Sequence, residues 1–301
     1  MTKVSITIPA TTANLGPGFD CLGLALGLYN QVEFTETESG LSVIVKGEGA
    51  NNIPADSNNL VIQSAEHLFN HIGRHPTGLK IIQQNNIPVG SGLGSSASAV
   101  LAGLLGANAL MDNSLSLSEI LTLAVEIEGH PDNVAPALFG GLILSIEENG
   151  RFLTESIPIP DMQVVIVLPD FNLPTAEARA ALPQKVPIAD AIFNIGRMAL
   201  LVRALSDGDY DRLSSAMLDR LHQPYRLPLI PGMAEAFSAV IEAGAAAVAL
   251  SGAGPSLIAF APENHETIAQ AAQETFSKAD LPSRHWILPI DRTGSQTTLL
   301  Q

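Results

Sequence analysis

Cysteine, aromatic side chains and basic side chains are all scarce in this chain of 301 residues. The single cysteine excludes an internal disulfide bond, which fits a reducing cytosol. Lys and Arg number 15 against 30 Asp and Glu, so the formal net charge is -15. This charge repels nucleic-acid backbones and anionic lipid surfaces, and we expect neither as a partner. A small anionic ligand remains compatible with it, provided that local donors or a bound cation offset the repulsion.

Solidly apolar runs of membrane-spanning length are also missing. Residues 85–111 and 243–261 carry no charge, but Gly, Pro or Ser interrupts both, which favours buried core with tight turns. The first residues, MTKVSITIPATTANLG, lack the basic and apolar regions of a signal peptide. Hydrophobic residues make up 46% of the chain and charged ones 15%, which is typical of a globular protein. We therefore expect a cytoplasmic location.

The hydrophobic patterns indicate a mixed α+β protein in two halves. In the first half we expect strands at 3–8, 32–38, 41–49, 78–88 and 140–148, and helices at 60–73, 97–111 and 116–129. The pattern restarts between residues 150 and 162. The second half predicts strands at 163–169, 246–254, 256–262 and 285–290, and helices at 175–182, 188–208, 233–245 and 265–279. The two expected domains are 1–155 and 156–301.

A glycine-rich loop precedes the most apolar of these helices, in PVGSGLGSSASAVLAGLLGANAL. Gly90, Gly92 and Gly94 permit positive φ and close approach to a ligand, and Ser95 and Ser96 suit a helix N-cap. Backbone N–H groups and the positive end of the helix dipole converge there, which predicts a phosphate site. Valine at Gly92 or Gly94 should then block phosphate without unfolding the protein. The loop has neither a Walker A lysine nor G-x-G-x-x-G spacing, and a tight turn without a ligand is the structural alternative.

The segment PVGSGLGSSA resembles the phosphate-binding motif P-x-x-x-G-L-G-S-S-A of the GHMP kinases, a family of small-molecule kinases. PATTANLGPGFDCLGLAL (9–26) and SGAGPS (251–256) resemble two further signatures of this family. With EGHPDNVAPALFGG (128–141), the set is most similar to the members that phosphorylate L-homoserine. The resemblance implies an α+β, two-domain GHMP kinase fold. Its N-terminal domain resembles ribosomal protein S5 domain 2, and its C-terminal domain is ferredoxin-like.

The reaction implied by this resemblance is phosphoryl transfer from ATP to the side-chain hydroxyl of L-homoserine, a step of threonine biosynthesis. The alternatives are a related kinase for another small alcohol and a non-catalytic nucleotide sensor on the same fold. The scarcity of cations argues against a polyanionic acceptor. The sequence leaves the oligomeric state open, with a homodimer as one expectation.

The resemblance implies ATP binding by the whole glycine loop, and Mg²⁺ bridging the phosphates would offset the acidity of the protein. Mg²⁺ takes one or two protein oxygens, for which Ser96 is one candidate. Glu126 and Glu128 diverge by about 200° on a helix, so they cannot both face the site. The family's metal-binding glutamate precedes an H-x-D element, which favours Glu126 and leaves Glu128 as the alternative. The expected ATP-binding residues are Pro88, Val89, Gly90, Ser91, Gly92, Leu93, Gly94, Ser95, Ser96 and Ala97.

The turn after that helix offers an imidazole, a carboxylate and an amide within four residues. His130, Asp132 and Asn133 join Glu126 as catalytic candidates. Sister kinases in the family use an aspartate here as a base, which makes Asp132 a candidate proton acceptor. An orienting role is the alternative for Asp132.

The expected acceptor site combines a polar turn with arginines. Asp20 suits a substrate ammonium group and Asn14 a hydroxyl or amine, although both residue types also stabilise turns. The arginine fork matches a planar carboxylate, and Arg179 shares a helix face with Thr175, in a T-x-x-x-R element resembling that of the family. Arg226 resembles a second family arginine. The expected substrate-binding residues are Asn14, Asp20, Thr175, Arg179, Arg226, Gly252 and Gly254.

Overall fold

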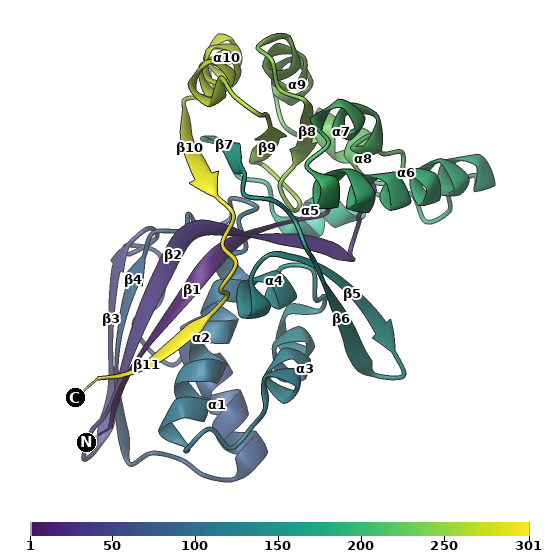
Figure 1. Ribbon diagram of the computed structural model, residues 1–301. Helices are drawn as coiled ribbons and strands as arrows, with labels where there is room; N and C mark the ends of the chain where they lie inside the picture. Colours follow the sequence, from purple (N-terminus) through teal and green to yellow (C-terminus); the bar gives the residue numbers. More distant parts are fainter. Residues whose placement is uncertain (1, 301) are drawn as a thin grey trace.

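The computed structural model describes residues 2–300 and contains two β-sheets with helices packed against them (Figure 1). The larger sheet has seven strands in the order β11-β1-β2-β4-β3, and β5 pairs with β2 and β6. Only the β3–β4 pair is parallel among the pairs of the described strands. The strands of this larger sheet are β1 (Lys3–Ala13), β2 (Leu22–Glu36), β3 (Gly40–Gly47), β4 (Gly78–Asn85), β5 (Leu142–Glu148), β6 (Arg151–Ile157) and β11 (Gln296–Leu300).

Four helices cover one face of this sheet (Figure 1): α1 (Leu60–Ile72), α2 (Ser95–Leu110), α3 (Leu117–Glu128) and α4 (Val134–Phe139). Helix α2 is buried on nearly every side because its residues are apolar or small. A Cβ atom on Gly103 would overlap the backbone of α1, and one on Gly106 would overlap the ring of Phe34 in β2. This close packing fixes the position of the α2 N-terminus.

The smaller sheet has four antiparallel strands in the order β10-β7-β9-β8. Helices α9 and α10 pack against one face, and a separate core joins the other face to β1 and β2. Helices α5 to α8 lie beside this sheet (Figure 1). The strands are β7 (Gln163–Pro169), β8 (Ala247–Leu250), β9 (Leu257–Phe260) and β10 (Ser283–Pro289). The helices are α5 (Thr175–Ala180), α6 (Ile188–Asp207), α7 (Tyr210–Ala216), α8 (Gln223–Arg226), the 3₁₀ turn η1 (Leu227–Leu229), α9 (Met233–Glu242) and α10 (His265–Lys278).

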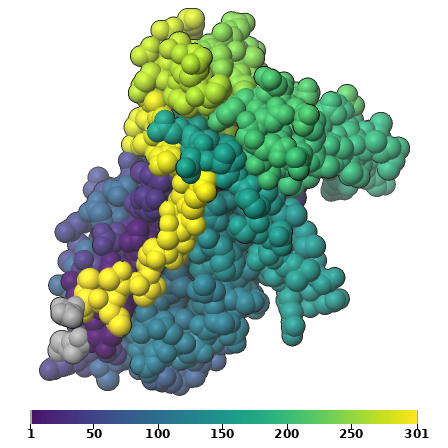
Figure 2. Space-filling view, viewed as in Figure 1, coloured from purple at the N-terminus to yellow at the C-terminus, as the bar shows by residue number. Residues whose placement is uncertain are grey.

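The C-terminal segment connects the two sheets. After β10 the chain crosses the surface to the larger sheet, where β11 pairs with β1 in the register Lys3↔Leu300 (Figure 2). Strand β6 also belongs to the larger sheet because it pairs along its length with β5. The division at residue 155 stays a prediction. No helix within residues 2–300 is both long and apolar enough to cross a membrane.

Three helix ends agree with the ranges expected from the sequence, and one expected helix cap is wrong. Asn59 caps α1 and Gly73 ends it, while Ser116 forms a capping box with Glu119 at the start of α3. At α2, however, the N-cap is Gly94 in the left-handed conformation, with φ 68°. The serines expected to cap this helix are its first two residues instead. Their hydroxyl groups are therefore free to contact other parts of the protein or a ligand.

Candidate active site

A cavity of about 300 Å³ lies where the glycine loop, the start of α2 and the 128–133 turn meet the C-terminal glycine-rich loop. Most of the residues predicted for the site line it, but Pro88, Val89, Leu93, Asp20, Glu126 and Asp132 do not. Its lining consists of Asn14, Gly90, Ser91, Gly92, Gly94, Ser95, Ser96, Ala97, Glu128, His130, Asn133, Thr175, Arg179, Arg226, Gly252, Ala253 and Gly254.

The glycine loop is packed against the C-terminal glycine-rich loop. The Ser251 hydroxyl donates to the Gly92 carbonyl at 2.7 Å, and a Cβ atom on Gly92 would overlap the Ser251 carbonyl. A Cβ on Gly94 would similarly overlap the Thr11 hydroxyl. Gly90 is different, since the nearest atom to its Cβ would be Asn172 Oδ1 at 3.7 Å. The expectation that valine at Gly92 or Gly94 would leave the fold intact is therefore wrong, because both positions are filled by neighbouring atoms.

Ser96, near the start of α2, donates a hydrogen bond to the Glu128 carboxylate at the end of α3. Burial raises the pKa of Glu128, and the Ser96 hydrogen bond partly opposes this rise. Glu126 lies elsewhere, with Oε2 3.4 Å from His67 Nε2 and a side chain 55% exposed. The structure thus brings Glu128 to Ser96, and not the Glu126 favoured by the family spacing. A hydroxyl and a carboxylate are suitable oxygen donors for Mg²⁺.

Partly exposed His130 and buried Asp132 form a pair at the wall of the cavity. His130 Nδ1 lies 2.9 Å from Asp132 Oδ1, and this hydrogen bond is the main cause that raises the His130 pKa, against the effect of burial. His130 lines the cavity, whereas Asp132 is 1% exposed and does not. Asn133, on the same turn, accepts a 2.9 Å hydrogen bond from Thr11 of β1, a residue that sequence reasoning missed.

An ion pair between Arg179 and Asp20 lies at one side of the cavity. The Arg179 guanidinium donates to both Asp20 oxygens, at 2.8 and 3.0 Å, and Asp20 is the main cause that raises the Arg179 pKa. The Asn14 side-chain oxygen accepts from the Asp20 backbone at 2.8 Å, so it has the turn-stabilising contact as well. Arg179 and Asp20 are therefore paired with each other in this structure.

Arg226 is buried, 1% exposed, and yet lines the cavity. Its guanidinium lies 3.3 Å from the Ala178 carbonyl, the Gly252 carbonyl and His222 Nδ1. Within residues 2–300 it forms no ion pair with a carboxylate. Burial lowers the Arg226 pKa, and Arg179 acts in the same direction. A buried charge without an oppositely charged partner is unfavourable, and an anionic ligand in the cavity would be a suitable partner.

A glycine loop at a rigid helix start, a hydroxyl–carboxylate pair and an arginine without a carboxylate partner together suit a small-molecule phosphotransferase. The chain matches the GHMP kinases N terminal domain over residues 59–141 and the GHMP kinases C terminal domain over residues 201–278. It belongs to the GHMP kinase family.

Relatives over nearly the full length are homoserine kinases. The enzyme of Moorella thermoacetica is 45% identical, covering 91% of this chain and 92% of its own. The homoserine kinase of Crocosphaera subtropica is 44% identical, and the match covers 98% of this chain and 97% of that enzyme. The crystal structure of homoserine kinase from Cytophaga hutchinsonii has a TM-score of 0.89 at 29% identity, covering 98% of this chain and 97% of that one. The expected α+β GHMP kinase fold is confirmed.

Proposed function

We propose that this protein transfers the γ-phosphoryl group of ATP to the side-chain hydroxyl of L-homoserine, giving O-phospho-L-homoserine. The observation that carries the proposal is Arg226, a buried guanidinium that lines the cavity and has neutral acceptors as neighbours. A substrate carboxylate would supply the missing negative charge. The full-length similarity to homoserine kinases supports the same acceptor.

ATP is expected to place its phosphates at the glycine loop and the start of α2. The N-terminal N–H groups of this helix attract anions, and the loop has no lysine that would do so by charge. A second cavity of about 490 Å³ shares Gly90, Ser95 and Ser96 with the first. It is lined by apolar groups and side-chain amides of the α1 and β4 regions, which suit a nucleoside. We assign the base and ribose to this second cavity.

Ser96 and Glu128 are our proposed protein ligands for Mg²⁺, in place of the pair Ser96 and Glu126. Their hydrogen bond supports this choice, because it places the hydroxyl oxygen and a carboxylate oxygen side by side next to the glycine loop. When bound, Mg²⁺ neutralises phosphate charge and orients the transferred group. Two protein ligands suffice because the nucleotide phosphates and water supply the rest.

A zwitterionic amino acid fits the acceptor side of the cavity. Arg226 would bind the carboxylate, and Asp20 would bind the ammonium group after partial release from Arg179. Arg179 would then share the carboxylate with Arg226, so that each protein charge keeps a partner. An acceptor without the carboxylate would leave Arg226 unpaired, which is the proposed basis of specificity.

His130 and Asn133 line the cavity beside Glu128, and they would orient the reacting hydroxyl and phosphoryl groups. Asp132 would act through His130, as a positioning residue, since its carboxylate is buried behind the imidazole. Phosphoryl transfer passes through a loose transition state and depends mainly on positioning and charge stabilisation. A strong base is therefore not required of Asp132.

The test is ADP release from Mg²⁺-ATP with a panel of acceptors: L-homoserine, L-threonine, L-serine, mevalonate and 3-aminopropan-1-ol, which is homoserine without its carboxylate. We expect turnover with homoserine to exceed that with 3-aminopropan-1-ol by 100-fold or more, roughly two charge-assisted hydrogen bonds. Preference for an uncharged alcohol would assign the protein to another reaction of the family. Binding of ATP without turnover of any acceptor would identify a nucleotide sensor.

A further inference from the structure

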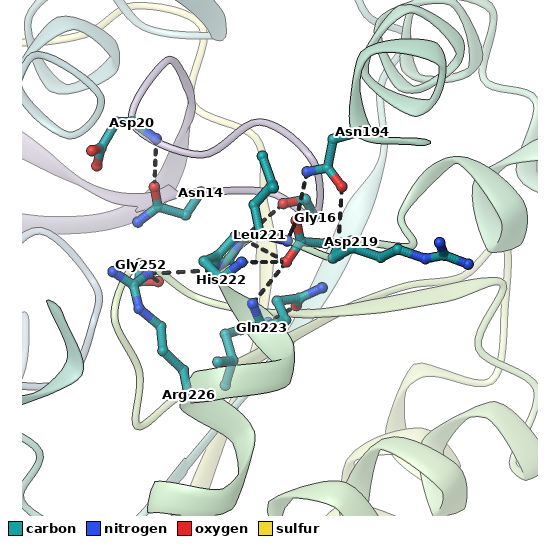
Figure 3. A network of polar contacts seen from close by, with 12 residues as sticks. Asn14, Gly16, Asp20, Asn194, Asp219, Leu221, His222, Gln223, Arg226 and Gly252 are labelled. Carbon is teal, nitrogen blue, oxygen red and sulfur yellow. Dashed lines mark hydrogen bonds and ion pairs between the residues drawn. The ribbon is translucent and has the colours of Figure 1, made fainter. Parts of the chain in front are cut away.

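His222 lies at the centre of a buried network beside the acceptor site and outside the cavity itself (Figure 3). It is fully buried and immediately precedes α8, the helix that carries Arg226. Asp219 holds the turn in place by accepting hydrogen bonds from the backbone N–H groups of Leu221, His222 and Gln223, at 2.7 to 2.9 Å. The backbone that carries the imidazole is thus held in place by the protein itself.

The two ring nitrogens of His222 have neighbours of opposite hydrogen-bonding character. Nε2 lies 2.7 Å from the Gly16 carbonyl oxygen, which can only accept. Nδ1 lies 3.3 Å from Arg226 Nη1, which can only donate. Both contacts are satisfied at once by a neutral imidazole that carries its proton on Nε2. An imidazolium would lose the contact with Arg226 and place a second positive charge against it.

The burial of His222 favours a neutral ring, whereas its charged neighbours act in both directions. Burial is the main cause that lowers the His222 pKa, and the charge of Arg226 lowers it further. Asp219, the Gly16 carbonyl and Asp20 act in the opposite direction. The Phe19 ring stacks on His222 with centroids 5.1 Å apart, and the Arg226 guanidinium lies 5.0 Å from the same ring.

We propose that His222 is a positioning residue that joins the acceptor loop 14–20 to Arg226 and orients this arginine without neutralising it. A carboxylate in its place would pair with Arg226 and compete with the substrate. The neutral imidazole instead accepts one hydrogen bond and leaves the positive charge for the ligand. Through Gly16 it also ties Arg226 to the loop that carries Asn14 and Asp20. The inference rests on the proposed function, in which Arg226 binds the homoserine carboxylate.

Two substitutions of His222 each remove one of its two hydrogen bonds and keep the other. In His222→Gln the amide nitrogen can reach the Nε2 position and bond to Gly16, but the acceptor for Arg226 is lost. In His222→Asn the amide oxygen can occupy the Nδ1 position and accept from Arg226, but the bond to Gly16 is lost. Each variant is assayed with homoserine and with the amino alcohol 3-aminopropan-1-ol, and the KM for ATP serves as the control for an intact fold.

We expect His222→Gln to raise the homoserine KM about 10-fold, the size of one charge-assisted hydrogen bond, while the KM for the amino alcohol changes little. His222→Asn should raise the KM values of both acceptors by a similar factor. This variant loses the hydrogen bond to Gly16 in loop 14–20 but keeps the one to Arg226. Equal loss of both acceptors in His222→Gln, or no loss in either variant, would overturn the proposal.

Nitrogen NMR of the histidine-labelled, unmutated protein gives a readout that needs neither turnover nor a stable variant. The neutral Nε2–H tautomer should persist from pH 7.5 to pH 6, and homoserine should shift the Nδ1 signal while ATP should not. An imidazolium, the Nδ1–H tautomer or an unresponsive ring contradicts the proposal. If the wild-type enzyme turns over another acceptor and His222 still shows this tautomer, the substrate assignment has failed and the arrangement of His222 has not.

Discussion

The two ends of the active-site cavity would attract negative charge by different means. At the start of α2 the donors are backbone N–H groups of glycines and serines, without any lysine or arginine in residues 85–111. At the acceptor end the donors are the guanidinium groups of Arg179 and Arg226. The backbone site depends on packing, since neighbouring atoms leave no room for side chains at Gly92 and Gly94. The arginine site depends on charge that the protein itself leaves partly unpaired. Substitutions at the first end should therefore affect stability and ATP, and those at the second should affect acceptor choice.

The largest expected effect is at the proposed metal ligand between the two ends. Glu128→Gln should lower kcat by 10²-fold or more, the scale of losing one preorganised electrostatic group. Glu126→Gln, two residues away on the same helix, is the matched control and should stay within about 3-fold of wild type. Measuring kcat against Mg²⁺ concentration for both variants distinguishes the two glutamates. A large loss in Glu126→Gln alone would restore the assignment favoured by the sequence.

The second-largest effect is expected at the end of the cavity that holds Arg179 and Arg226. Arg226→Leu should raise the homoserine KM by about 10- to 100-fold, because a charge-assisted bond to a buried carboxylate is worth roughly 1.5–3 kcal/mol. The KM for ATP should stay close to that of wild type. Steady-state kinetics with each substrate varied in turn provides the measurement. If both KM values rise together, Arg226 does not belong to the acceptor site alone.

The third prediction compares two glycines of the loop at the end of the cavity where backbone N–H groups are the donors. Gly92→Ala should destabilise the fold by several kcal/mol, since its Cβ atom would overlap the Ser251 carbonyl. Gly90→Ala has space for the methyl group but keeps a φ of 67°, so it should cost about 1–2 kcal/mol and weaken ATP binding several-fold. Urea unfolding and ATP titration of both variants test the distinction. Equal stability of the two would show that the loops are not locked together.

The smallest effect concerns the single thiol beside the acceptor site. Burial, with Asp132 and Asp20, raises the pKa of Cys21 to about 11 from 9.0. A raised pKa in the folded state favours folding below the unfolded value, and this contribution is lost as the pH rises from about 9 to 11. Iodoacetamide should therefore alkylate Cys21 slowly at pH 8 in the folded protein and rapidly in urea. Fast alkylation of the folded protein at this pH would contradict the burial.

The glycine loop and its family were predictable because a short motif specifies them, and the cavity includes most of the residues that the motifs named. The choice between Glu126 and Glu128 was not, because it depends on how α3 is rotated by its packing. Asp132 was equally ambiguous, since no pattern indicates which of two neighbouring polar groups is buried. His222 belongs to no motif and is recognised only by its neighbours. Strands β6 and β11 were missed because their residues are mostly exposed, as in QTTLL, and give little hydrophobic signal.

The pairing of β11 with β1 has a consequence for biosynthesis. Strand β1 is the first of the described strands to leave the ribosome and β11 is the last, yet they are neighbours in one sheet (Figure 1). Until residues 296–300 emerge, the side of β1 that pairs with β11 is an open sheet edge. Open edges can pair with strands of other nascent chains. The larger sheet therefore cannot be completed before residues 296–300 have left the ribosome. Removal of these few residues should lower the soluble yield far more than their small buried area suggests.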